Sequence, residues 1–198
     1  MKNLSLTQQY LLCVLNKNGK LPTFGLDKTL CLSAAGVLEL LMEDALDFDG
    51  KKLTVKSPLP EEKAYLRPVY QVVEKKQPVK FESVVEYFSL AFTDKHMNEL
   101  IDSIGAALVQ KGCVQREEKD GLFGGKDLYI PNEADVDAQY QRMVKKLGDC
   151  IVPPQIQEKF PVYAFFVRDP DDYKVEFQRI LLKDQELVGG YRKTEEVN

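Results

Sequence analysis

The chain has 198 residues, of which 44% are hydrophobic and 29% charged, with a formal net charge of −4. This length and composition suit one folded domain that needs neither disulfides nor a metal to bury a core, and they argue against disorder. No apolar run approaches the ~20 residues that span a bilayer, and the N-terminus has no signal-peptide pattern. The expected location is therefore the cytoplasm.

The potential metal ligands are few and scattered. The four cysteines stand at positions 13, 31, 113 and 150 without a C-x-x-C spacing, and the sequence has one histidine, His96. We predict no zinc site and interpret the cysteines as reduced core thiols. Because the sequence pI is 5.2, binding to a polyanion would need a local basic patch.

In the first half of the chain, caps and apolar periodicity predict helices and one hairpin. Ser5 and Gln8 form a capping-box pattern before a helix that should end near Asn18. A second helix, apolar on nearly all sides, should run from about 27 to 45. The dipeptide at 49–50, Asp-Gly, favours a hairpin turn. Further helices are expected over 61–75, interrupted near Pro68, and over 81–90.

The second half predicts more helices around another hairpin. Thr93 should cap a helix over 94–111 that ends at Gly112 in a left-handed conformation. Strands over 113–118 and 126–130 form the hairpin, and Asn132 caps a helix to about 147. Asp169 and Pro170 resemble the start of a last helix, from 170 to 187.

Together these elements predict a mainly α fold, with a single helical domain around a helical core and two short β-hairpins. Residues 1–150 are expected to form this domain. Residues 151–198 are expected to form a helical extension that packs on the same domain.

The sequence offers little material for catalysis, and we predict no enzymatic activity and no cofactor. No serine lies in a G-x-S-x-G motif. His96, alone on its helix, is interpreted as a surface or capping residue. The glycine-rich segment 121–127 is one residue too short for a phosphate-binding loop and lies between strands. Glu39, inside the apolar second helix, should have a hydrogen-bonding partner, since an unpaired buried carboxylate is costly.

The tip of the second hairpin is the most informative surface feature. Leu122 and Phe123 lie at this tip, and Lys119 and Lys126 flank them. Exposed apolar residues mark a partner or a membrane surface, and flanking lysines suit an anionic bilayer. The alternative is that the hairpin folds back and buries both apolar side chains.

Five segments in the same order resemble the Golgi phosphoprotein 3 family. They are Leu4–Leu12 (LSLTQQYLL), Leu32–Leu40 (LSAAGVLEL), Val72–Pro78 (VVEKKQP), Ala107–Gly112 (ALVQKG) and Leu128–Pro131 (LYIP). The resemblance covers about residues 4–148. It implies a mostly helical, non-enzymatic domain whose eukaryotic relatives are peripheral membrane proteins that recognise phosphatidylinositol 4-phosphate. It also implies a hairpin used in membrane contact or self-association, and this chain resembles a stand-alone bacterial relative.

The resemblance also locates the lipid pocket. The pocket tryptophan of the family falls at Phe24, and its three arginines fall at Ser33, Asn98 and Ile101, so those charges are missing. Lys28 and Lys95 lie within a turn or two and are the candidate basic substitutes. Arg and Lys hold phosphorylated headgroups through charge-assisted hydrogen bonds, but Lys lacks the fork of Arg.

Two alternative functions remain open at this stage. The first is a protein-interaction scaffold that binds no lipid. The second is a winged-helix regulator, since the helix over 94–111 is followed at once by a two-stranded wing. Its acidic residues at 94, 99 and 102 would repel DNA phosphates, so a nucleic-acid partner is not predicted.

Overall fold

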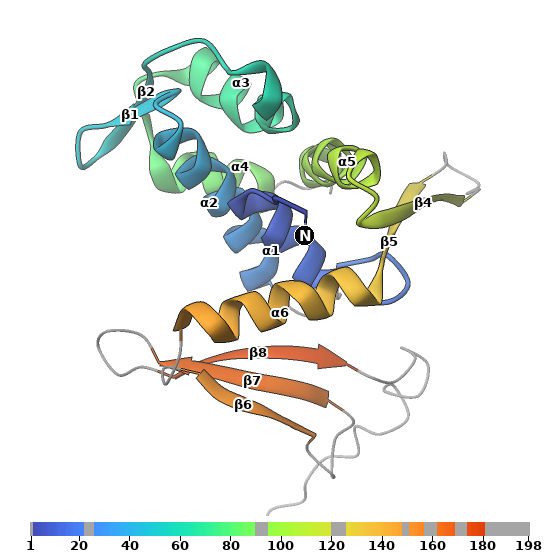
Figure 1. The fold of residues 1–198 in the computed structure, drawn as a ribbon. Helices are drawn as coiled ribbons and strands as arrows, with labels where there is room; N and C mark the ends of the chain where they lie inside the picture. Colours follow the sequence, from blue (N-terminus) through green and yellow to red (C-terminus); the bar gives the residue numbers. More distant parts are fainter. Residues whose placement is uncertain are drawn as a thin grey trace, which may run out of the picture. The chain divides into compact units, whose positions relative to one another are not determined.

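The fold is that of a computed structural model (Figure 1). The structure describes residues 2–21, 26–89, 95–119, 126–147, 151–156, 162–168 and 174–180. Two compact units, residues 1–139 and 140–198, make up the chain. The first unit is largely helical, which confirms the predicted mainly α class.

Helices dominate the first unit (Figure 1). They are α1 (Leu6–Val14), α2 (Leu26–Met42), the 3₁₀ helix η1 (Glu61–Leu66), α3 (Arg67–Lys76), α4 (Phe81–Ser89) and α5 (Lys95–Gln110). α1 packs against α2 and α5, α2 also packs against α4, and α5 also packs against η1 and α3. These helices enclose the core, in which leucine is the most frequent residue, for example Leu11, Leu12, Leu32, Leu40, Leu66, Leu100 and Leu108.

The predicted caps explain where several helices begin and end. Ser5 caps α1 in a reciprocal capping box with Gln8, as expected. The interruption expected near Pro68 is the junction of η1 and α3, where Pro68 occupies the first turn of α3. Gly112, just after α5, has a φ of 66°, which confirms the left-handed C-cap. Thr93 lies outside the described residues.

Both predicted hairpins are confirmed. β1 (Leu46–Phe48) and β2 (Lys52–Val55) join around Gly50, whose φ is 91°. In that turn the Asp49 carboxylate accepts hydrogen bonds from the backbone N–H groups of Lys51 (2.8 Å) and Lys52 (2.7 Å). A short β3 (Val79–Lys80), not foreseen from the sequence, pairs with β2. The second hairpin joins β4 (Val114–Lys119) and β5 (Lys126–Pro131).

After β5, Asn132 accepts a hydrogen bond from the backbone N–H of Ala134 at the start of α6 (Glu133–Leu147), as predicted. α6 crosses the boundary between the two units. The domain boundary expected at residue 150, and the packing expected for residues 151–198 on the first domain, stay predictions.

The prediction of a helix over 170–187 is wrong for residues 174–180, which form β8 (Lys174–Ile180). β8 pairs antiparallel with β7 (Val162–Arg168), and β7 pairs with β6 (Ile151–Ile156). Polar and apolar residues alternate from Lys174 to Gln178 with the period of a strand, and Phe177 lies opposite Phe165. This alternation outweighs the helix-start signal of Pro170. The second unit therefore has a three-stranded sheet where a helical extension was expected.

Tyr129 of β5 fixes the second hairpin against α5. A Cβ placed on Gly105 would lie 2.5 Å from the Tyr129 ring, so the ring occupies the space that any other residue would fill. The Tyr129 hydroxyl also donates a hydrogen bond to the Asp102 carbonyl at 3.2 Å. The position of the second hairpin against α5 thus depends on Gly105, in the middle of that helix.

We expect Gly105→Ala to destabilise the protein by about 1–3 kcal/mol, because the added methyl group would displace the Tyr129 ring. In an exposed helix the same change would stabilise by about 1 kcal/mol. Urea denaturation measures the free energy of unfolding. The control is Ala106→Gly at the exposed neighbouring position, which should cost about 1 kcal/mol. A gain in stability for Gly105→Ala would contradict this packing.

Candidate functional site

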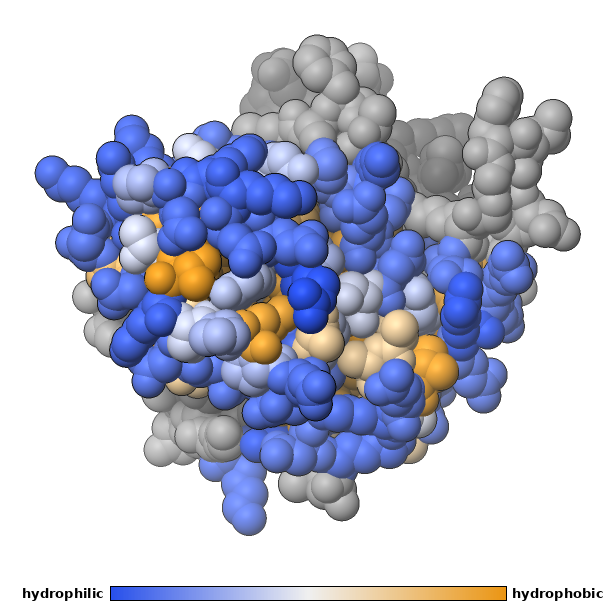
Figure 2. All heavy atoms as spheres, turned by 90° about the horizontal axis from the view of Figure 1, so that it is seen from above, coloured by the Kyte–Doolittle hydropathy of each residue, from blue (hydrophilic) through white to orange (hydrophobic). Residues whose placement is uncertain are grey.

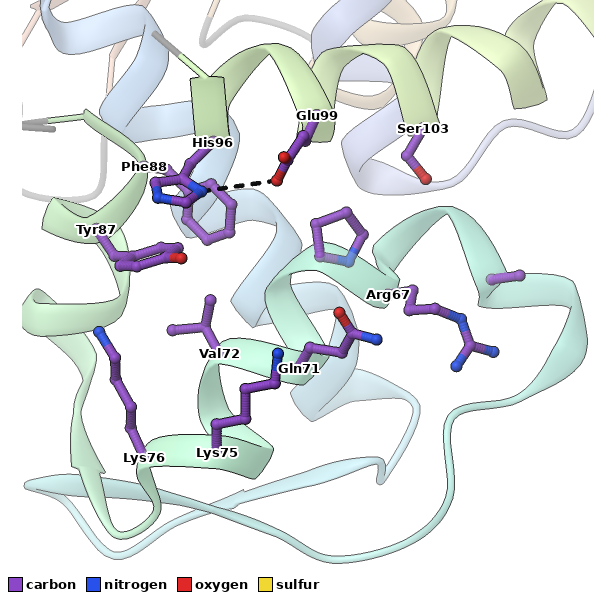
Figure 3. A pocket seen from close by; sticks show the side chains of 12 residues that line it. Arg67, Gln71, Val72, Lys75, Lys76, Tyr87, Phe88, His96, Glu99 and Ser103 are labelled. Atoms are coloured by element: carbon purple, nitrogen blue, oxygen red, sulfur yellow. Dashed lines mark ion pairs between the residues drawn. The ribbon is translucent and has the colours of Figure 1, made fainter. Parts of the chain in front are cut away.

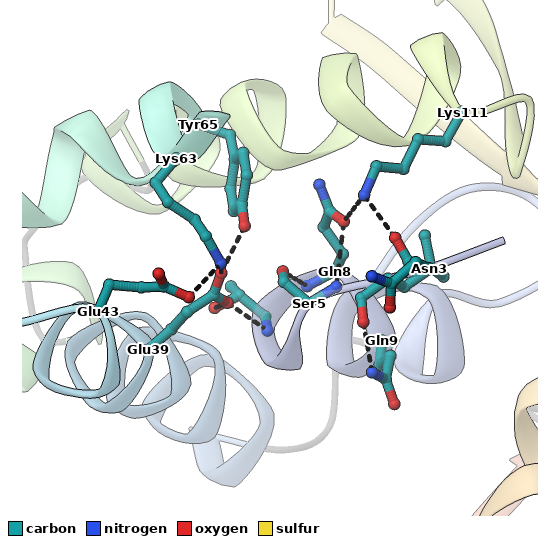
Figure 4. Close-up of polar contacts among 11 residues, drawn as sticks. Asn3, Ser5, Gln8, Gln9, Glu39, Glu43, Lys63, Tyr65 and Lys111 are labelled. Atoms are coloured by element: carbon teal, nitrogen blue, oxygen red, sulfur yellow. Dashed lines mark hydrogen bonds and ion pairs between the residues drawn. The ribbon is translucent and has the colours of Figure 1, made fainter. Parts of the chain in front are cut away.

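Glu39 is the buried charge that the sequence singled out, and the structure surrounds it with hydrogen-bond donors (Figure 4). One carboxylate oxygen accepts from the Thr7 backbone N–H (2.9 Å) and hydroxyl (2.7 Å). The other accepts from the Lys63 ammonium (2.9 Å) and the Tyr65 hydroxyl. Lys63 also pairs with Glu43 at 2.7 Å. The expected partners are therefore present, and the structural interpretation of Glu39 is confirmed.

These donors determine the charge state of the cluster. Burial by itself would raise the pKa of Glu39, but the hydrogen bonds from Tyr65, Thr7 and Lys63 lower it below its ordinary value of 4.5. Burial, together with the hydrogen bond to Glu39, raises the pKa of Tyr65 to about 12. Glu39 is thus a stable carboxylate at neutral pH. A general acid would need the opposite shift.

The single histidine lies at a different place, in the first turn of α5. Its ring stacks on Tyr87 at a centroid distance of 4.2 Å, and its Nδ1 lies 3.6 Å from a Glu99 carboxylate oxygen. Within the described ranges, no group of three His, Cys, Asp or Glu side chains is arranged to hold a metal ion.

The two candidate basic residues of the lipid pocket lie on different helices. Lys28 lies in the first turn of α2, where partial burial lowers its pKa. Lys95 is the first residue of α5 and is exposed. Among the described residues, no hydrogen bond or ion pair joins them. Phe24, the aromatic candidate, lies outside the described residues.

The positions where the family resemblance places arginines are occupied by residues with other roles. Ser33 is fully buried in α2, and its hydroxyl donates to the carbonyls of Thr29 and Leu30, each at 3.0 Å. Asn98 and Ile101 are half-buried on α5. None of these side chains supplies a positive charge.

The structure brings Lys119 and Lys126 together, as directly opposed positions at the far end of the second hairpin. Like charges in this arrangement destabilise a strand pair. Nearer the core, Arg116 neutralises Asp127 through an ion pair of 2.7 Å. Leu122 and Phe123 at the expected tip lie outside the described residues, so their contacts stay a prediction.

A groove between α3, α4 and α5 was not predicted from the sequence (Figure 3). Its volume is about 450 Å³. Its side chains come from segments up to 39 residues apart, Ala64 to Ser103. The spacing of Arg67, Gln71 and Lys75, four residues apart on α3, was the sequence signal for one wall. Nothing in the sequence indicated which helix would face it.

The surface seen in Figure 2 is mostly hydrophilic, with small separate hydrophobic areas. The most exposed large apolar side chains in the described part of the chain are Leu6, Leu38, Met42 and Phe48. Leu38 and Met42 are neighbours on one face of α2, and so small a number of exposed apolar side chains is normal on protein surfaces. The face shown therefore consists mostly of polar and charged groups and shows no broad apolar patch.

We expect Glu39→Gln to lower the free energy of unfolding at pH 7 by about 3 kcal/mol, because it leaves Lys63 partly unpaired in a buried place. The pKa of Glu39 is lowered by folding, so its contribution is present above about pH 4.5 and is lost as pH falls through the folded-state value. Urea denaturation between about pH 3 and pH 7 should show that the free energy of unfolding falls less on acidification in the variant than in the wild type.

The matched control for that experiment is Glu43→Gln, since Glu43 shares Lys63 but is 37% exposed. Its cost should stay below about 1 kcal/mol. Equal losses in the two variants would show that Glu39 has no special structural role.

In a comparison with family models, the model described as Golgi phosphoprotein 3 (GPP34) matches residues 6–155. No curated protein matches the chain. The match spans about three quarters of the sequence. The chain therefore belongs to the Golgi phosphoprotein 3 family.

Proposed function

We propose that this member of the Golgi phosphoprotein 3 family is a non-enzymatic peripheral membrane module that binds anionic lipid headgroups, phosphoinositides among them. The observation that carries the proposal is the family match over residues 6–155. In the described segments, no helix is long and apolar enough to cross a membrane. Attachment to the membrane surface would thus use headgroup contacts and the hairpin tip.

The electrostatics around Lys28 support headgroup binding. A cation in the first turn of a helix is unfavourable, because the helix N-terminus already carries partial positive charge. Partial burial adds to this by lowering the pKa of Lys28. A bound phosphate would offset both effects, since helix N-termini and lysines each favour anions. Lys95 is a second, exposed lysine at the start of a helix, α5.

The far end of the second hairpin supports the same function. Lys119 and Lys126 lie opposite each other at the last described positions before the tip. An anionic surface would relieve their mutual repulsion, and Phe123 and Leu122 would enter the interface between headgroups and acyl chains. The apolar tip of the hairpin would then insert into the membrane, while the lysines are attracted to its anionic headgroups.

The missing arginines set the expected selectivity. A lysine is a point charge and cannot grip a phosphate through two parallel hydrogen bonds as arginine does. We therefore propose that the protein responds to the negative charge density of a membrane more than to one particular headgroup. Phosphatidylglycerol and phosphatidylinositol 4-phosphate should then bind in proportion to their charge.

We expect Lys28→Gln/Lys95→Gln to weaken binding to phosphatidylglycerol vesicles by roughly thirtyfold, because each lysine near an anionic surface contributes about 1 kcal/mol. Co-sedimentation with vesicles measures the binding. The matched control is Lys17→Gln/Lys51→Gln, two exposed lysines with the same change in net charge. If both double variants lose binding equally, binding depends only on the net charge of the protein, and the proposed pocket is refuted.

We also expect Phe123→Asp to abolish binding to the same vesicles, since it places a carboxylate where an aromatic ring should enter the membrane, whereas Phe123→Leu should retain it. Added salt should weaken wild-type binding, because charges are screened over about 10 Å at 0.1 M. Absence of wild-type binding to neutral, phosphatidylglycerol and phosphatidylinositol 4-phosphate vesicles would refute the lipid function and favour the protein-interaction scaffold.

A further inference from the structure

The groove between α3, α4 and α5 has a charge opposite to that of the whole chain. Arg67, Lys75 and Lys76 bring three basic side chains to its lining, against the single carboxylate of Glu99. That carboxylate lies beside His96. The protein as a whole has a net charge of −4. The groove is therefore a local basic feature on an acidic molecule.

The donors along one wall are exposed and have no partner in the part of the chain that the structure describes. Arg67, Gln71 and Lys75 are exposed, and their side chains make no hydrogen bond or ion pair among the described residues. In Figure 3, Gln71 and Lys75 point toward the space between α3 and α5. Lys76 is different, because its ammonium lies 4.3 Å from the centre of the Tyr87 ring. The wall thus presents unused donors to a ligand.

The floor of the groove is apolar. Val72 and Phe88 are almost completely buried, and Pro68 lies beside them in the lining. A ligand that fits this site needs acidic groups toward the Arg67, Gln71 and Lys75 side chains and apolar groups toward the floor. Free phosphate and inorganic anions have only the first of these.

The spacing of the donors favours a chain over a compact anion. Side chains four residues apart on a helix are separated by about 6 Å along its axis. Arg67, Gln71 and Lys75 therefore form a row, and do not converge on one point as a phosphate site requires. In an extended peptide, every second side chain lies on the same face at intervals of about 6.6 Å. The two repeats match closely over the length of the row.

We propose that this groove binds an extended acidic segment of a partner protein in which acidic and apolar residues alternate. The acidic side chains contact Arg67, Gln71 and Lys75, and the apolar side chains pack on Pro68, Val72 and Phe88. This site is separate from the lipid contacts proposed above and does not depend on them. It uses none of Lys28, Lys95, Lys119 or Lys126.

Fluorescence anisotropy with the full-length protein tests the proposal. The probe is a fluorescein-labelled heptapeptide with alternating glutamate and valine, and the reference probe has the same composition with its glutamates in one block. We expect the alternating peptide to bind several-fold more tightly. Arg67→Glu/Lys75→Glu should weaken its binding at least about tenfold, since two attractions become repulsions. Lys17→Glu/Lys51→Glu, the exposed control pair, should change it less than about threefold.

The proposal would be overturned by no binding of the alternating peptide, by equal binding of both peptides, or by equal losses in the two double variants. Inorganic phosphate at matched ionic strength provides a further arm. If phosphate displaces the probe, the groove is a compact anion site and the peptide assignment is wrong. Vesicle binding by Arg67→Glu/Lys75→Glu should fall no more than that of Lys17→Glu/Lys51→Glu, which has the same change in net charge, and this separates the site from the lipid function. Circular dichroism should show an unchanged fold, because neither substituted side chain has a partner in the described residues.

Discussion

The buried carboxylate of Glu39 is the interaction on which the arrangement of the first unit depends. It lies on α2 and accepts hydrogen bonds from Thr7 on α1 and from Lys63 and Tyr65 on η1. Apolar packing alone leaves helices free to slide and rotate, because the hydrophobic effect has no direction. A buried charge with directed donors permits one relative position, since every other position leaves the charge unpaired. Glu39 therefore fixes where η1 begins its turn into α3.

A second set of polar contacts holds the C-terminal end of α5 (Figure 4). Lys111 donates to the Asn3 carbonyl and the Gln8 side chain, each at 2.7 Å. Lys2 donates to the Gly112 carbonyl at 2.7 Å. Positive side chains at a helix C-terminus interact favourably with its dipole. The N-terminal segment is thus tied to α5, and α5 in turn forms one wall of the basic groove and supports the second hairpin through Gly105 and Tyr129.

Both proposed functions depend on positive charge that is concentrated locally on an acidic protein. An acidic chain approaches an anionic membrane or an acidic peptide only where its positive charge is concentrated. In the described structure, positive side chains line the exposed wall of α3, and two lysines stand at opposed positions at the end of the second hairpin. One place would serve the lipid surface and the other a protein segment, so a single small domain could join a partner to a membrane.

Much of the local structure followed from the sequence. The Ser5 capping box, the Asp49-Gly50 turn, the break at Pro68 and the C-cap at Gly112 were all predicted correctly. Each of these signals acts within about four residues, through caps, fixed φ values or turn preferences. The helix-start pattern of Asp169-Pro170 was misleading for 174–180, where the alternation of the sequence and the pairing with β7 both favour a strand. Pairing energy comes from a partner strand that no short window contains.

The sequence by itself determined the family, the helices of the first unit and the fact that Glu39 needed partners. Only the tertiary structure decided which residues those partners were, because Thr7 and Lys63 lie 32 and 24 residues away along the chain. The same holds for the groove, whose basic wall was visible as a spacing on α3 but whose apolar floor comes partly from α4. A sequence records which groups must be satisfied or buried, and the packing of distant segments decides what satisfies them and which surfaces remain open.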